Sequence, residues 1–147
     1  MPKKRNTALT RNDLRRLARL RLKEAEHLYS EELYDGCVYL CGYVVECALK
    51  ARICKFLGLA AYPADGEHGR IFKTHNFGIL KLLAGLEGEI TIAKNKKLFN
   101  NWSTATKWDT EQRYAPAGTC DRQRAAEVIA SVKERPSGVL TWLTKRW

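Results

Sequence analysis

The sequence predicts an all-α protein that folds as an antiparallel up-and-down bundle of four to five main helices. Apolar residues recur at intervals of three and four in several segments. Glycine or proline separates these segments, and none of them alternates apolar and polar residues as a strand would. The 147 residues, 45% hydrophobic and 29% charged, suit one globular domain. We therefore expect a flexible basic tail over residues 1–9 and one helical domain over residues 10–147.

The first two expected helices carry the clearest signals. Thr10 and Asp13 resemble a capping box, so a helix should begin after Thr10 and run to about residue 32. A second helix is expected from Asp35, as its cap, to about residue 56, before Gly58. It is apolar nearly all round, which places it at the centre of the bundle.

The remaining segments alternate between loops and helices. We expect, in order, a loop at 58–73, helices at 75–86 and 90–107, a loop at 108–119, a last helix after residue 121 and a final turn at 139–143. Thr74 and Asp121 are the expected caps. Pro136 and Gly138 should interrupt the last helix.

The formal net charge of +10 indicates a polyanionic partner, most often nucleic acid, although a basic surface can also serve solubility alone. The positive charge is concentrated in the tail and the first helix. There Arg11, Arg15 and Arg19 recur at intervals of four, so we expect them on one solvent-facing edge that contacts the RNA backbone.

Several classes of protein are disfavoured. No apolar run is long enough to span a bilayer, and no apolar segment follows the basic N-terminus as in a secretory signal. Four of the five cysteines fall in one helix, which favours free thiols in a reducing, cytoplasmic setting. We find no metal-ligand spacing and no phosphate-binding glycine loop, and we expect no metal and no cofactor.

Three segments, in the same order, resemble the HEPN (higher eukaryotes and prokaryotes nucleotide-binding) family. Residues 34–51, YDGCVYLCGYVVECALKA, resemble the family's second-helix signature: a tyrosine–aspartate turn, a glycine–tyrosine pair and an E-x-x-LKA ending. Thr74 and His75 resemble the pair that opens its third helix. Arg113 and Tyr114, followed by Pro116, resemble its "RY" loop. The match spans about residues 10–135.

The resemblance implies a bundle of four to five helices, often dimeric, in a family that includes toxins paired with a nucleotidyltransferase antitoxin, RNases and nucleotide-binding modules. We expect a cytoplasmic protein that binds RNA or nucleotide in a toxin–antitoxin or defence setting. The alternatives are a metal-independent endoribonuclease and a non-catalytic docking module. Four tryptophans and a broken last helix also favour an exposed apolar face, and hence a homodimer.

Four polar residues share one stripe of the second helix: Tyr39, Tyr43, Glu46 and Lys50. The stripe could bind a nucleotide, with the tyrosines against a base and Lys50 on phosphate. It could equally be structural, with Glu46 paired to Lys50 and the tyrosine hydroxyls satisfied.

His75 and the pair Arg113 and Tyr114 lie at loop–helix junctions, where sites are commonly built. In a bundle they could converge on Glu46, and Arg113 could neutralise that carboxylate or bind phosphate. His75 could instead only cap or pack.

RNases of the HEPN family resemble one another in an arginine followed, after four to six residues, by a histidine. Arg70 and His75 fit this spacing, with His75 assisting attack by a ribose 2′-hydroxyl and Arg70 steadying the phosphate. Arg21 and His27 fit it too, so the spacing arises easily in this chain. Arg70 is also expected in a loop, which departs from the RNase pattern. The sequence leaves open whether the protein is an enzyme.

Overall fold

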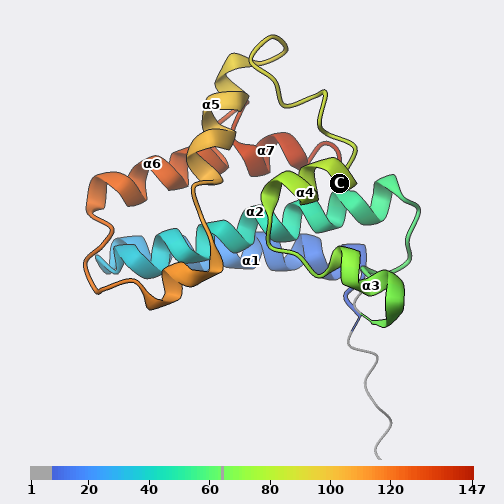
Figure 1. The fold of residues 1–147 in the computed structure, drawn as a ribbon. Helices are drawn as coiled ribbons and strands as arrows, with labels where there is room; N and C mark the ends of the chain where they lie inside the picture. The colour runs from blue at the N-terminus through green and yellow to red at the C-terminus, as the bar shows by residue number, and fades with distance from the viewer. Residues whose placement is uncertain (1–7, 64) are drawn as a thin grey trace, which may run out of the picture.

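The structure is a computed structural model that describes residues 8–63 and 65–147. They form seven α-helices and one 3₁₀ helix. These residues contain no strand beyond one isolated bridge between Thr10 and Ala61. The all-α prediction is confirmed. Four helices have ten or more residues: α1 (Arg11–Ser30), α2 (Tyr34–Phe56), α5 (Lys96–Ala105) and α6 (Arg122–Lys133). Figure 1 shows α1 and α6 both running alongside α2.

The start of α1 is as predicted. The Thr10 side chain accepts a hydrogen bond from the Asp13 backbone, and the Asp13 carboxylate accepts one from the Thr10 backbone. The expected tail falls almost entirely outside the described residues. Of its two described members, Leu9 accepts a hydrogen bond at its carbonyl from the Tyr62 backbone, at 2.8 Å.

The turn between α1 and α2 differs from the prediction. Helix α1 ends at Ser30, because Glu32 adopts a left-handed conformation with φ of 61°. Helix α2 begins at Tyr34 without a side-chain cap, so the prediction that Asp35 caps it is wrong. The Asp35 carboxylate instead accepts hydrogen bonds from the backbone amides of Gly118 and Cys120, at 2.6 and 2.7 Å. It thereby ties the loop before α6 to the start of α2.

Helix α2 is the centre of the bundle, as predicted. It contacts α1, α4 (Phe77–Leu83), α5, α6, α7 (Val139–Leu143) and the 3₁₀ helix η1 (Thr110–Tyr114). Its buried positions occur all round the helix, so nearly every turn carries a side chain of the core.

The observed elements differ most from the predicted ones in the middle of the chain. Part of the expected 58–73 loop is helix α3 (Gly66–Phe72). Helix α4 begins later than predicted, because Asn76 rather than Thr74 caps it by accepting from the Ile79 backbone at 3.1 Å. Helix α5 begins only after Asn95, which accepts from the Leu98 backbone at 2.9 Å. Asparagine at these positions stops a helix from extending further back, because its side chain takes the place of the preceding turn.

The C-terminal elements follow the prediction. Asp121 caps α6 by accepting from the Arg124 backbone at 2.8 Å. Residues 134–138 interrupt the helix before the short α7.

All four tryptophans are buried within the single chain, including Trp147, which is 3% exposed. The tryptophans therefore contribute no apolar face to a dimer, and the homodimer stays a prediction. Trp147 also contacts the three arginines that were expected on a solvent-facing edge. The Arg11 guanidinium donates to the Trp147 main-chain oxygen, and those of Arg15 and Arg19 lie 5.5 and 4.8 Å from its ring centroid. Arg11 and Arg15 are half-buried and only Arg19 is exposed, so the predicted solvent-facing edge is wrong for two of the three.

Among the described residues, no helix combines the length and apolar character that a bilayer crossing requires.

Candidate functional site

The site is built around Glu46, which is 4% exposed in the middle of α2. Lys50, one helical turn later, donates to its Oε1 at 2.7 Å. His75, just before α4, places its Nδ1 2.9 Å from both carboxylate oxygens. Two neighbouring groups thus satisfy a carboxylate that would otherwise be costly to bury. The predicted convergence of His75 on the α2 stripe is observed, but Lys50, rather than Arg113, is the cation that pairs with Glu46.

The carboxylate also fixes the orientation of the His75 ring. A carboxylate accepts hydrogen bonds, so Nδ1 carries the proton and Nε2 is left for a ligand or solvent. The His75 side chain is 55% exposed, whereas that of Glu46 is 5% exposed. A buried acid therefore holds an accessible imidazole, an arrangement that suits hydrogen bonding to phosphate or proton transfer.

Lys50 is held on two sides. Besides the ion pair with Glu46, its ammonium lies 5.0 Å from the ring centroid of Tyr62. The Tyr62 hydroxyl donates to the Phe72 carbonyl at the end of α3, at 2.7 Å. With a side chain only 17% exposed, Lys50 chiefly balances the charge of Glu46.

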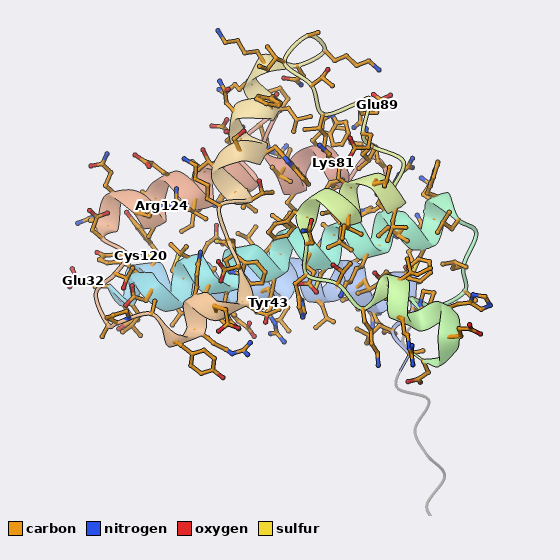
Figure 2. All side chains as sticks on the ribbon, in the orientation of Figure 1. Glu32, Tyr43, Lys81, Glu89, Cys120 and Arg124 are labelled. Carbon is orange, nitrogen blue, oxygen red and sulfur yellow. The ribbon has the colours of Figure 1, made fainter. Side chains whose placement is uncertain are left out.

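The two tyrosines of the stripe form the other half of the site. Their hydroxyls are 3.0 Å apart, and the rings of Tyr39 and Tyr43 meet edge to face with centroids 5.2 Å apart. Tyr43 also lies edge-on to His75, at 6.5 Å between centroids. Burial, followed by the hydrogen bond with Tyr39, raises the pKa of Tyr43 to about 12. Its hydroxyl is therefore protonated at neutral pH. Figure 2 labels Tyr43 at the middle of the bundle.

Trp108 is the residue of this site that the sequence prediction missed. Its Nε1 donates to the Tyr39 carbonyl at 3.0 Å, and its ring lies 5.0 Å from that of Tyr43 and 5.5 Å from that of Phe77, between centroids. A Cβ at residue 42 would overlap its indole. A glycine in the middle of a buried helix was the available signal, because such a glycine usually marks a close approach.

Arg113 and Tyr114 form an exposed rim beside the tyrosine pair. They end η1, which Asp109 caps by accepting from the Glu111 backbone at 2.8 Å. The Arg113 guanidinium lies 4.8 Å from the Tyr114 ring centroid, and Tyr114 is 73% exposed. Hydrogen bonding to Tyr114 and then to Tyr39 raises the pKa of Arg113, so its charge is permanent. The Arg113 side chain is thus a cation available to a phosphate.

Arg70 lies in the last turn of α3, where it is exposed and takes no part in the described hydrogen bonds of Glu46 and His75. The expectation that Arg70 lies in a loop is wrong. Gly66, with φ of 82°, and the buried Gly69 are accommodated in the helix. The expected loop position of Arg70 departed from the RNase pattern, and the helical position that is observed removes this departure.

A cavity of about 420 Å³ opens beside His75, between the start of α4 and the junction of α5 with η1. No group of three or more His, Cys, Asp or Glu side chains suited to a metal ion occurs among the described residues.

The comparisons with known proteins give one result. A family model described as the HEPN domain matches residues 12–143. No curated protein and no solved structure matches the chain.

Proposed function

Because this chain belongs to the HEPN domain family, whose functions relate to nucleotides and RNA, we propose that it binds RNA or a nucleotide at the site around Glu46. One observation supports this most. Lys50 alone would balance the buried carboxylate, yet Glu46 also holds a half-exposed His75 with Nε2 free. A purely structural network has no need of a second, solvent-facing partner.

The groups around His75 suit a nucleotide. Glu46 and Lys50 cancel each other's charge, and the Arg113 guanidinium is an exposed cation that matches a phosphate. In an RNA, the exposed Tyr114 ring offers a stacking surface for a neighbouring base. Arg19, the exposed member of the arginine edge, would extend the contact to the RNA backbone. We further propose a cytoplasmic toxin–antitoxin or defence setting with a nucleotidyltransferase partner.

The binding proposal is tested by fluorescence anisotropy with a short single-stranded RNA over a range of salt concentrations. Arg113→Gln should weaken binding and lower the salt slope by about one, because one phosphate contact is lost. Arg135→Gln is the matched control, since Arg135 is also exposed but lies after α6. If the two variants bind RNA equally well, the site around Glu46 is not where RNA binds.

A second candidate, metal-independent RNA cleavage, draws support from the fixed His75 ring and from the helical position of Arg70. In this reaction the 2′-oxygen forms a bond to the adjacent phosphorus as the bond from phosphorus to the 5′-oxygen breaks. His75 Nε2 takes the proton of the 2′-hydroxyl, and the leaving 5′-oxygen takes a proton from water. Arg70 or Arg113 would steady the phosphate charge.

Cleavage is tested with RNA carrying a single 2′-deoxy substitution at the cut site. The enzyme reading requires products with a 2′,3′-cyclic phosphate or 3′-phosphate, activity in EDTA and no cut at the substituted position. His75→Ala should lower the rate at least about a hundredfold. His68→Ala, an exposed histidine of α3, should not. Binding without any cut would leave the binder proposal standing. A stable nucleotidyltransferase complex with no RNA binding would favour the docking module.

A further inference from the structure

The cavity beside His75 has its own lining, largely distinct from the predicted site residues. Its volume of about 420 Å³ is within the range of small-ligand pockets. It is lined by His75, Asn76, Phe77, Gly78, Trp102, Thr106, Trp108, Asp109 and Thr110. Of these, only His75 is among the site residues that the sequence predicted.

Three aromatic rings give the cavity a rigid apolar wall. Phe77 lies between the two tryptophans, 6.3 Å from Trp102 and 5.5 Å from Trp108, between centroids. Trp108 is fixed by its bond to the Tyr39 carbonyl, and the Lys81 ammonium lies 5.6 Å from the Trp102 ring centroid. Flat, immobile aromatic surfaces favour a planar ligand, as a nucleobase is.

Two side chains at the cavity present opposite hydrogen-bonding character. Asp109 accepts from the Glu111 backbone through Oδ1, and its Oδ2 has no hydrogen-bond partner among the described residues. Asn76 accepts from the Ile79 backbone through Oδ1, which leaves its amide N–H groups as donors. The cavity thus offers a carboxylate acceptor and an amide donor that the fold itself does not use up.

From these groups we infer that the cavity selects a guanine base, an inference that rests on the proposed nucleotide-binding function. Guanine carries two adjacent N–H donors, at N1 and at the exocyclic N2, beside the O6 acceptor. A carboxylate accepts such a parallel pair as it accepts the paired N–H groups of a guanidinium. Asp109 is the acceptor for N1 and N2, and the Asn76 amide is the donor for O6. Adenine and cytosine present a ring-nitrogen acceptor in place of the N1–H, and uracil has a single N–H.

The same arrangement sets the direction of the nucleotide. The charge of Asp109 repels phosphate, so the base occupies the cavity and the phosphate lies on the side of His75 Nε2 and Arg113. Asp109 therefore determines which base binds. His75 lines the base cavity and also faces the phosphate side of the site.

Isothermal titration calorimetry with guanosine, inosine and adenosine 5′-monophosphates tests this assignment. Wild type should prefer the guanosine nucleotide about tenfold or more over the other two, because inosine lacks the N2 amino group and adenine lacks both donors. Asp109→Asn keeps an oxygen to cap η1 but turns an acceptor into a donor. It should lower guanosine-nucleotide affinity about tenfold to a hundredfold and should not lower adenosine-nucleotide affinity, because the lost carboxylate pairs with guanine alone.

Glu111→Gln is the matched control, because it removes an exposed carboxylate of η1 that does not line the cavity. It should bind like wild type. Equal affinity of wild type for all three nucleotides, or an Asp109→Asn variant that keeps the preference, overturns the guanine assignment while nucleotide binding itself stands. Absence of binding to every nucleotide and to single-stranded RNA overturns the proposed function as well.

Discussion

Gly42 lies directly beneath the indole of Trp108, so closely that any side chain at residue 42 would occupy the space of the ring. The contact brings the junction of α5 and η1 down onto the middle of α2. One hydrogen atom in place of a methyl group thus decides where an aromatic wall of the site lies. It also gives a physical reason for the glycine of the glycine–tyrosine pair.

Gly42→Ala should displace Trp108 and destabilise the domain. Forcing a methyl group into a packed core costs about 1–3 kcal/mol, which outweighs the gain in helix propensity from alanine. Urea denaturation measures the loss. Gly88→Ala is the control, because a Cβ there meets nothing within 4 Å, and it should change stability little. Equal stability of Gly42→Ala and wild type would mean that Trp108 can move aside freely.

Glu46→Gln should lower the free energy of unfolding by about 1–3 kcal/mol, because it leaves the Lys50 ammonium without its counter-charge. Removal of Lys50 as well, in Glu46→Gln with Lys50→Met, should cost less than the sum of the two single changes. Glu87→Gln is the comparison at the surface, where Lys81 is 3.9 Å away and Glu87 is 53% exposed, and it should cost under about 1 kcal/mol. Strict additivity of the Glu46 and Lys50 changes would contradict the ion pair.

Alkaline pH should weaken the fold through Tyr43. Its pKa is raised from the ordinary 10.0 to about 12, first by burial and then by the bond to Tyr39. A raised folded-state pKa contributes stability that is complete below pH 10 and is lost as the pH rises through 12. Urea midpoints measured from pH 8 upward should therefore decline, and Tyr43→Phe should decline less steeply. Parallel pH profiles of the two proteins would exclude Tyr43 as a source of the dependence.

Replacement of Arg11, Arg15 and Arg19 by glutamine should affect folding as well as RNA binding. These side chains hold Trp147, through one hydrogen bond and two contacts over the ring, each worth about 0.5–2 kcal/mol. The triple variant should unfold at lower urea, and its RNA affinity should depend less on salt. Arg16→Gln, on the exposed face of α1, should leave stability unchanged. A triple variant as stable as wild type would show that Trp147 needs no arginine.

A homodimer remains a prediction, and the structure offers one place for it. A groove of about 480 Å³ between α1 and α6 has a mostly apolar surface. It is lined by Tyr29, Ala126, Ile129 and Ala130 together with the charged Glu26, Lys133 and Glu134. Light scattering should give about twice the mass of one chain, and Ile129→Arg should halve it, because a charge there would be buried. Ile92→Arg, at a site 59% exposed, is the control. A wild-type mass equal to one chain rules the dimer out.

The parts of the site that lie on α2 were predictable because helical periodicity is local. The spacing of Tyr39, Tyr43, Glu46 and Lys50 places them on one stripe whatever the rest of the chain does. The approach of His75 followed from its position at a loop–helix junction of the expected bundle. Trp108 and Trp147 escaped prediction because each meets partners far away along the chain, and no local pattern encodes such contacts.

Misplaced boundaries have a similar cause. Gly66 and Gly69 predicted a loop, because glycine has a low intrinsic helix propensity. The seven-residue helix α3 nevertheless includes both. Thr74 looked like the cap of α4, yet its hydroxyl accepts from the Asn76 backbone at 3.0 Å and Asn76 does the capping. Thr74 and Asn76 are both suitable caps for α4, and the backbone geometry before the helix determines which of them caps it.

Because α2 is central, its amides and those of the surface helices should exchange hydrogen by different routes. Its backbone amides lie among the other helices, so most should exchange only when the whole domain unfolds. The amides of α4 and η1, in short helices at the surface, should exchange through local opening. A nucleotide bound at the site would slow exchange at residues 75–77 and 109–114 by suppressing local opening. It would slow exchange in α2 only by the amount that binding adds to the global free energy of unfolding. One exchange experiment would therefore report global stability from α2 and ligand occupancy from the rim.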